Sequence, residues 1–142
     1  SITSIATLIS FLEQKNFDYV YNKVETEAKR FFYKGKGTIP FFIRFIASNS
    51  SDNKKFQDRY IKNFGFRFST IKKLINDKKP IILSLFNDGR NYYKNHTVLI
   101  VGYEIWQVGH KKRKMLIIYD NWTSSYSYID YNKLSKISTI CY

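Results

Sequence analysis

The first third of the chain carries hydrophobic residues at the spacing of helices. In residues 1–14 they fall three and four positions apart on more than one stripe, which predicts a deeply buried helix. A second helix is predicted over residues 18–32, with Asp18 as its N-cap. Two glycines end this helix, and Pro40 then opens a third helix that contains the apolar residues of 41–46.

The pattern changes near the middle of the chain. Residues 47–55, rich in Ser, Asn and Asp, are expected to form a loop. Phenylalanine at every second position of 64–68 predicts a half-buried strand or an extended link. Ser69 or Thr70 is then expected to cap a short helix that ends near Asp77.

The rest of the chain is predicted to be mostly strand. Apolar runs of strand length, rich in Val and Ile, cover residues 81–86, 96–105 and 115–119, and shorter candidates cover 126–129 and 137–142. A basic hairpin over residues 109–114 joins two of these strands. Helices first and strands afterwards indicate an α+β fold, and we expect residues 1–142 to form a single domain.

The charge of the chain raises the question of an anionic partner. There are 24 basic and 11 acidic residues among 142, a formal net charge of +13. Such a balance suggests a polyanion, either nucleic acid or an anionic cell surface. The alternative is a compositional bias toward Lys, Asn, Ile, Phe and Tyr, whose codons are rich in A and T. The tyrosines beside a lysine at 92–94 could stack on bases, or they could belong to the core and rim of a small domain.

Few residues are available for metal binding or redox chemistry. The single cysteine, Cys141, excludes an intrachain disulfide and a cysteine-rich zinc site, and two histidines make a metal cluster hard to assemble. We therefore expect neither a metal nor a cofactor. Cys141 lies in a strand-like run, and we interpret it as a small core residue. No apolar run reaches the roughly 18 residues needed to cross a bilayer. The sequence also shows no signal-peptide pattern, which a mature secreted chain would have lost.

His96 and Asp120 stand out because one begins and the other follows an apolar strand run. Antiparallel neighbours joined by a hairpin can bring these side chains together, and a carboxylate there would orient the imidazole and stabilise its charged form. His96 is expected to share one face of a central strand with Val98, Ile100 and Gly102. The same pattern is also typical of a hydrogen-bonded core histidine and a turn aspartate.

Three segments resemble papain-like cysteine peptidases. Residues 96–103, HTVLIVGY, are similar to the histidine strand of these enzymes, and residues 116–122, LIIYDNW, to the strand after it, where Asn or Asp precedes a Trp by two positions. Residues 1–6, SITSIA, resemble the residues directly after the nucleophile in the bacterial C39-like branch. Shorter similarities at 37–40, 79–82 and 128–130 extend the resemblance over nearly the whole chain.

The resemblance implies a papain-like fold, with N-terminal helices packed on an antiparallel sheet, and peptide hydrolysis by a Cys-His-Asp mechanism. The cysteine would lie at the N-terminus of the first helix, where the helix dipole and an imidazolium favour the thiolate. His96 would act first as base and then as acid, and Asp120 would orient it. Trp122 would either shield this contact from water or simply pack in the core.

The nucleophile is the point at which this chain departs from the family pattern. Its expected place is immediately before Ser1 or, in a shifted alignment, Ser1 itself, so we interpret the chain as a fragment, a mutant or a pseudo-enzyme that is inactive as written. The glutamine that completes the oxyanion hole upstream is also absent. His110 is expected to be solvated rather than catalytic, and the sequons at Asn95 and Asn121 are interpreted as chance matches.

Three functions remain open on these patterns. The first is a C39-like cysteine peptidase domain acting on a peptide or protein, from a bacterial secreted or surface protein, although a cytoplasmic location also fits the sequence. The second is a catalytically silent papain-like module that binds a peptide or a polyanion. The third is a basic nucleic-acid-binding protein, whose affinity would fall steeply with salt. Neither the substrate nor the oligomeric state follows from the sequence.

Overall fold

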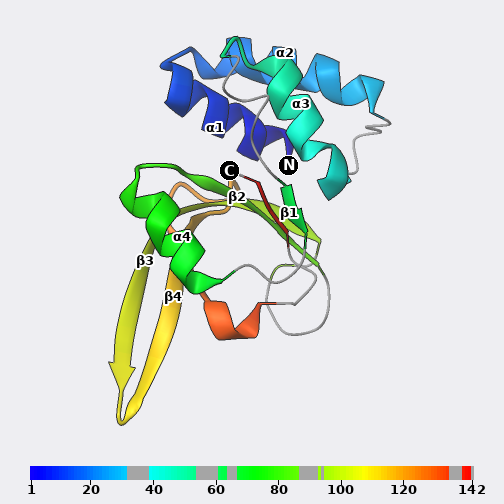
Figure 1. The fold of residues 1–142 in the computed structure, drawn as a ribbon. Coiled ribbons are helices and arrows are strands. Elements are labelled where there is room, and N and C mark those ends of the chain that lie inside the picture. Colours follow the sequence, from blue (N-terminus) through cyan, green and yellow to red (C-terminus); the bar gives the residue numbers. More distant parts are fainter. Residues whose placement is uncertain are drawn as a thin grey trace. The chain divides into compact units, whose positions relative to one another are not determined.

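The structure is a computed structural model that describes residues 1–31, 39–53, 61–63, 67–86, 93, 95–134 and 139–141, with the backbone alone at 61–63 and 139–141. The chain forms two compact units, in which Ser1–Ile61 makes up most of the first and Lys62–Ile140 most of the second. The first unit is helical and the second is built on a sheet, so the two are described in turn (Figure 1).

The helical unit contains the three helices that the sequence predicts. They are α1 (Ile2–Glu13), α2 (Phe17–Arg30) and α3 (Ile43–Ser50), the last preceded by the 3-10 turn η1 (Pro40–Phe42). The apolar spacing in α1 predicts the burial of five residues that the structure buries: Ile2, Ile5, Ala6, Leu8 and Ile9. Ser4 is buried with them, and Leu12 is half-buried.

Two helix boundaries differ from the predicted ones. The N-cap of α2 is Asn16, whose Oδ1 accepts a hydrogen bond from the Tyr19 N–H, so the prediction of Asp18 as cap was wrong. The α3 helix continues to Ser50, so the loop expected over 47–55 was wrong for its first four positions. The reason is spacing, because Ile43, Ile46, Ala47 and Ser50 lie on one face of the helix and are all buried.

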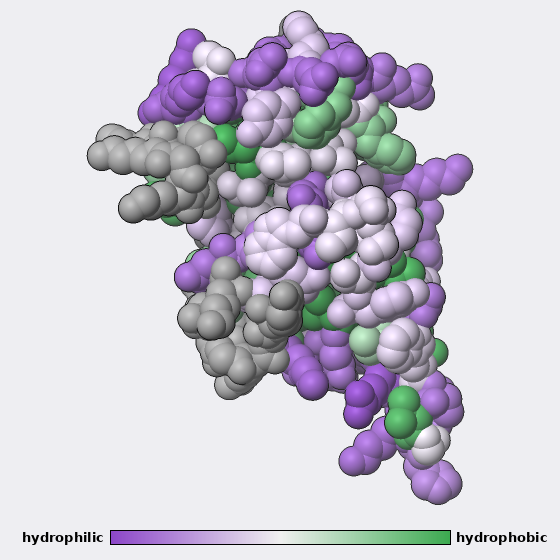
Figure 2. Space-filling view, turned by 180° about the vertical axis from the view of Figure 1, so that it is seen from behind, coloured by the Kyte–Doolittle hydropathy of each residue, from purple (hydrophilic) through white to green (hydrophobic). Residues whose placement is uncertain are grey.

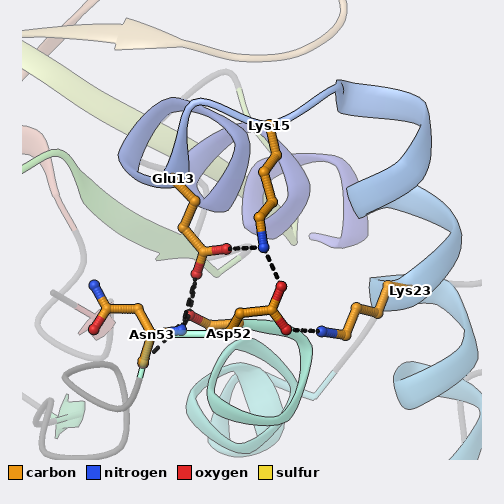
Figure 3. Close-up of polar contacts among 6 residues, drawn as sticks. Glu13, Lys15, Lys23, Asp52 and Asn53 are labelled. Atoms are coloured by element: carbon orange, nitrogen blue, oxygen red, sulfur yellow. Dashed lines mark hydrogen bonds and ion pairs between the residues drawn. The ribbon is translucent and has the colours of Figure 1, made fainter.

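A polar network joins the helices at the surface of this unit (Figure 3). Lys15 contacts the carboxylates of both Glu13, at 3.1 Å, and Asp52, and Lys23 Nζ reaches Asp52 Oδ1 at 2.7 Å. The Asn53 N–H donates to Glu13 Oε1 at 3.3 Å. These contacts connect the segment after α3 to the end of α1 and to α2.

The sheet unit has the strand order β1-β6-β2-β3-β4-β5. Its elements are β1 (Ile61–Asn63), α4 (Phe68–Asn76), β2 (Ile81–Leu85), β3 (His96–Val108), β4 (Lys111–Tyr119), β5 (Ser127–Asp130), η3 (Tyr131–Lys133) and β6 (Thr139–Cys141). The pairs β2–β3, β3–β4 and β4–β5 are antiparallel. The predicted α+β class is confirmed, as are the central place of β3 and the strands near the end of the chain.

Helix α4 covers one face of the sheet and forms its core. Phe68, Ile71 and Leu74, three positions apart, pack with apolar side chains of β2, β3, β4 and β5 in one buried cluster. The helix begins at Phe68 with Arg67 as its N-cap, so the prediction of Ser69 or Thr70 as cap was wrong. Phe68 itself is helical rather than extended, and residues 64–66 of the expected strand lie outside the described residues.

A β-bulge in β3 changes which residues share a face. Ile100 pairs with Ile118 but Gly102 pairs with Ile117, so Val101 is an extra residue in the ladder. A Cβ added to Gly102 would lie 3.0 Å from Ile117 Cδ1. Gly102 therefore lies on the face opposite Ile100, and the expectation that His96, Val98, Ile100 and Gly102 share one face was wrong at Gly102.

The hairpin between β3 and β4 is longer than predicted. Its turn has only two residues, Gly109 and His110, and the register continues to the Val108–Lys111 pair. Gly109 has a φ of 59° at the first turn position, as a type II′ turn requires. The predicted basic hairpin of 109–114 is therefore mostly strand. In the described parts of the chain, no helix has the length and hydropathy needed to cross a membrane.

Removing the Asp52 carboxylate is expected to destabilise the helical unit in a pH-dependent way. Hydrogen bonds from Lys15 and Lys23 lower the pKa of Asp52 to about 2. Because the folded-state pKa is depressed, the stabilisation is present above the ordinary carboxyl pKa and is lost as the pH falls through about 2. The free energies of unfolding of the wild type and Asp52→Asn should therefore differ near neutral pH and converge in strong acid.

A double-mutant cycle with Lys23→Gln measures the pair itself. The Asp52–Lys23 coupling should shrink at about 1 M salt, because both side chains are partly exposed and screened by ions. A coupling that does not change with pH or salt would contradict the electrostatic origin.

Candidate functional site

The site lies where β3 begins and β4 ends. His96 is the first residue of β3, and Asp120 directly follows β4. Leu99 pairs with Tyr119, and the strands are antiparallel, so the residues after Tyr119 run alongside the start of β3. The hairpin thus brings together two residues that are 24 positions apart in the chain.

One hydrogen bond joins the two residues. His96 Nε2 lies 2.7 Å from the main-chain carbonyl oxygen of Asp120. A carbonyl oxygen only accepts, so Nε2 carries the proton and donates it, which makes Nδ1 the basic nitrogen of the ring. The sequence led us to expect the Asp120 carboxylate in this place, and the structure has the carbonyl of the same residue there instead.

The Asp120 carboxylate is buried and fixes the turn after β4. Oδ1 accepts from the Trp122 N–H at 3.0 Å, from the Thr123 N–H at 3.1 Å and from Thr123 Oγ1 at 3.3 Å, while Oδ2 accepts from the Tyr93 hydroxyl at 2.9 Å. Burial raises the pKa of Asp120, but these hydrogen bonds outweigh it and hold the pKa below its ordinary value. The carboxylate is therefore ionised and holds the backbone that presents the carbonyl to His96.

Two aromatic rings flank the imidazole. The Trp122 ring stacks on His96 with centroids 4.0 Å apart, and the Tyr93 ring lies 5.7 Å from the imidazole at an interplanar angle of 17°. The two aromatic rings also contact each other at 5.5 Å. Tyr93 is 6% exposed and belongs to the α4 core, whereas Trp122 is 59% exposed. Trp122 covers one side of the imidazole from the surface, so the alternative of simple core packing was wrong.

The imidazole is poised to be neutral. Burial lowers the pKa of His96 from its ordinary value, and the hydrogen bond to the Asp120 carbonyl offsets this only in part. The result is a ring with a proton on Nε2 and a lone pair on Nδ1 near neutral pH. Such a ring can accept a proton through Nδ1 without losing the contact that orients it.

Two asparagines in left-handed backbone conformation flank the site. Asn95, just before His96, has a φ of 47°, and Asn121, between Asp120 and Trp122, has a φ of 62°. Asparagine tolerates this conformation better than other residues with a Cβ. The left-handed backbone conformation thus explains why asparagine occupies these two positions.

The other predicted site residues lie elsewhere. Ser1 is the N-cap of α1 in the helical unit, and its place opposite His96 stays a prediction. Cys141 lies in β6, and its side chain is outside the described residues. His110 is exposed in the turn between β3 and β4. Within the described residues, no three His, Cys, Asp or Glu side chains come together as a metal site would require.

Two contributors were not assigned from the sequence. Tyr93 was considered only as a base-stacking or core residue, and no local pattern connects it with Asp120 across 27 positions. The contact with Thr123 had a signal in Asp120 itself, because an aspartate in a turn commonly accepts from backbone N–H groups that follow it.

Comparison with protein families gives a match over nearly the whole chain. A family model described as the Peptidase_C39 like family matches residues 1–140, which spans both compact units. Comparisons with curated proteins and with solved structures gave no match.

Tyr93→Phe is expected to destabilise the fold by removing one hydrogen bond to the buried Asp120 carboxylate. A hydrogen bond to a charged group contributes about 1.5–3 kcal/mol to the free energy of unfolding. Because the pKa of Asp120 is depressed in the folded state, this loss is present above the ordinary carboxyl pKa and disappears as the pH falls through the folded-state value. Denaturant unfolding at neutral and acidic pH measures both effects.

Tyr126→Phe is the matched control, since it removes a hydroxyl from a tyrosine that is 66% exposed. Its stability should stay within about 0.5 kcal/mol of the wild type. Equal losses in the two variants would show that the Tyr93–Asp120 contact does not stabilise the site.

Asn121→Val is expected to destabilise the protein by about 1–2 kcal/mol, because a β-branched residue strains a left-handed backbone. Asn121→Gly should be tolerated, since glycine adopts positive φ freely. Thermal unfolding of both variants tests this. Asn22→Val, at an exposed position inside α2, serves as a control for the loss of an asparagine, and a loss as large as that of Asn121→Val would contradict the backbone explanation.

Proposed function

The chain belongs to the Peptidase_C39 like family, and we propose that it is a cysteine peptidase domain in which His96 is the general base. The observation that carries the proposal is the oriented imidazole. Its Nε2 donates to the Asp120 carbonyl at 2.7 Å, and burial lowers the pKa of the ring, so Nδ1 is the proton acceptor. A peptide or protein is the substrate that the family suggests.

The nucleophile in this proposal is a cysteine at the N-terminus of α1, directly before Ser1 or at that position. Ser1 is the N-cap of a helix of twelve residues, and the N-terminus of a helix favours an anion beside it. A thiol there would have a lowered pKa and would be the thiolate that attacks a carbonyl. A serine hydroxyl is too weakly acidic to replace it.

The proposed reaction has two halves. Neutral His96 first takes the thiol proton on Nδ1. The thiolate attacks the carbonyl carbon of the scissile bond, and the protonated ring gives that proton to the leaving amine, so that the C–N bond breaks and a thioester remains. Neutral His96 then takes a proton from water, the hydroxide displaces the thiolate, and the acid product leaves. Asp120 is a positioning residue in this scheme, because its carbonyl, held by the capped turn, orients the imidazole.

The decisive experiment restores the nucleophile. The chain as written should not hydrolyse peptides, whereas the chain preceded by its natural upstream residues, or by a single Cys directly before Ser1, should show cleavage that alkylation blocks. His96→Ala should lower kcat by about a thousandfold or more, because it removes both the base and the acid. Asp120→Ala should lower kcat by about 10- to 100-fold, because the imidazole is misplaced but present.

Two controls separate this reaction from other chemistry. His110→Ala removes the second histidine, which is exposed in the hairpin turn, and should leave cleavage intact. Cys141→Ser should do the same. Cleavage that survives His96→Ala, or that disappears with Cys141→Ser, would overturn the assigned roles. If the natural upstream sequence has no cysteine, the domain is instead the catalytically silent binding module.

A further inference from the structure

The outer half of the β3–β4 hairpin extends beyond its neighbours in the sheet (Figure 1). Strand β2 pairs with β3 only as far as Ile100, and β5 pairs with β4 only over Met115–Ile118. Residues 105–108 and 111–114 therefore pair only with one another, and all of residues 105–114 are exposed. A two-stranded ribbon exposed on both faces is only marginally stable in water, so a partner that covers it would stabilise it.

The two strands of this ribbon differ in chemistry. The β3 half carries three exposed apolar side chains, Ile105 at 50%, Trp106 at 39% and Val108 at 49%. The β4 half consists of four cations in sequence, Lys111, Lys112, Arg113 and Lys114. Figure 2 shows the far end of the hairpin, at the lower right, with purple hydrophilic side chains beside green hydrophobic ones.

The register distributes both kinds of side chain over both faces. Trp106 pairs with Arg113 and Val108 with Lys111, while Ile105 pairs with Lys114. Paired residues share a face, and successive pairs alternate between faces. Each face of the ribbon therefore presents apolar surface next to two cations.

The positive charge of the ribbon is not neutralised by nearby acids. Every ion pair among the described residues lies in the helical unit. Glu104, which directly precedes the ribbon in β3, accepts hydrogen bonds from Trp106 Nε1 at 2.5 Å and from the Tyr128 hydroxyl at 3.4 Å. All four cations of the ribbon are exposed, but Lys114 already contacts the rings of Phe68 and Tyr131. We therefore assign contacts with an anionic partner to Lys111, Lys112 and Arg113.

A partner that fits this ribbon must offer anionic groups and an apolar phase together. Nucleic acid supplies phosphates, but its phosphate backbone offers no apolar phase for Ile105 and Val108, which are 50% and 49% exposed. An anionic lipid bilayer supplies both at its interface, where tryptophan and aliphatic side chains enter the headgroup boundary and Lys and Arg contact phosphates.

We propose that the outer half of the β3–β4 hairpin binds the surface of an anionic lipid bilayer. Ile105, Trp106 and Val108 enter the interface, and Lys111, Lys112 and Arg113 contact lipid phosphates. The hairpin enters the interface with its turn first, so that side chains of both faces reach the headgroups. It does not span the bilayer, because its outer backbone edges have no partners there and must stay hydrated. This binding is independent of the proposed peptidase reaction, since none of these residues takes part in it.

The test is vesicle binding by the whole chain. It should co-sediment with vesicles of phosphatidylcholine and phosphatidylglycerol, much less with phosphatidylcholine alone, and binding should weaken as salt is added. In Lys111→Gln/Lys112→Gln/Arg113→Gln the partition coefficient should fall roughly a hundredfold, because each cation near such a surface contributes a factor of about five. The control Lys73→Gln/Lys79→Gln/Lys133→Gln removes three exposed cations from the same unit, and so the same charge, and should bind within about threefold of the wild type.

Two further measurements address the apolar strand. In Trp122→Phe, which retains Trp106 as the one tryptophan, fluorescence should shift to shorter wavelength on anionic vesicles. Ile105→Ser/Val108→Ser should lower vesicle binding roughly tenfold, because apolar surface is lost from the interface. Circular dichroism of every variant checks that the fold is kept.

Three outcomes overturn the proposal. The first is no preference for anionic vesicles. The second is an equal loss of vesicle binding in the two triple variants that remove cations, which would assign binding to net charge rather than to the hairpin. The third is displacement of the protein from vesicles by a duplex oligonucleotide, together with equal affinity of that oligonucleotide for the wild type and for Ile105→Ser/Val108→Ser. This result would make nucleic acid the partner.

Discussion

The site depends on the carboxylate and the main-chain carbonyl of Asp120 making different contacts. The carboxylate is buried and held by Tyr93, Trp122 and Thr123, and this leaves the main-chain carbonyl as the group that meets His96. A carbonyl has no net charge, so it fixes the proton on Nε2 without the strong stabilisation of imidazolium that a carboxylate would give. Burial then dominates and lowers the pKa of His96. The carbonyl orients the histidine and raises its pKa in part, but burial has the larger effect and the pKa stays below its ordinary value.

The bulge at Val101 separates the buried first part of β3 from its exposed second part. Before it, β3 is central and its side chains are buried on both faces, which gives His96 a rigid base. After it, the change of face turns Tyr103 toward α4, where its ring meets Phe68 at 5.7 Å, and places Gly102 against Ile117. Beyond this contact the strand leaves the core and forms the exposed ribbon with β4.

Much of the fold could be predicted from the sequence because hydrophobic period decides it. The N-terminal helices, the apolar parts of β2, β3 and β4, and the α+β class follow from apolar spacing. The basic outer part of β4 does not, because it has no apolar residues to mark it as strand. The bulge could not be predicted, because nothing in the apolar run HTVLIVGY marks the residue that is left out of the ladder. It shows only in the pairing with β4. The meeting of His96 with Asp120 could be predicted, but which oxygen of Asp120 faces the ring could not, because that depends on Tyr93.

The length of β3 bears on whether both proposed activities can belong to one molecule. His96 is the first residue of the strand and Val108 the last of thirteen, so about 40 Å separate them at the usual rise per residue. That distance exceeds the depth of a bilayer headgroup region, so a hairpin bound at the interface would leave the histidine in water, where a peptide can reach it. Lipid binding and hydrolysis then use opposite ends of the same rigid strand, and neither requires the surface that the other occupies.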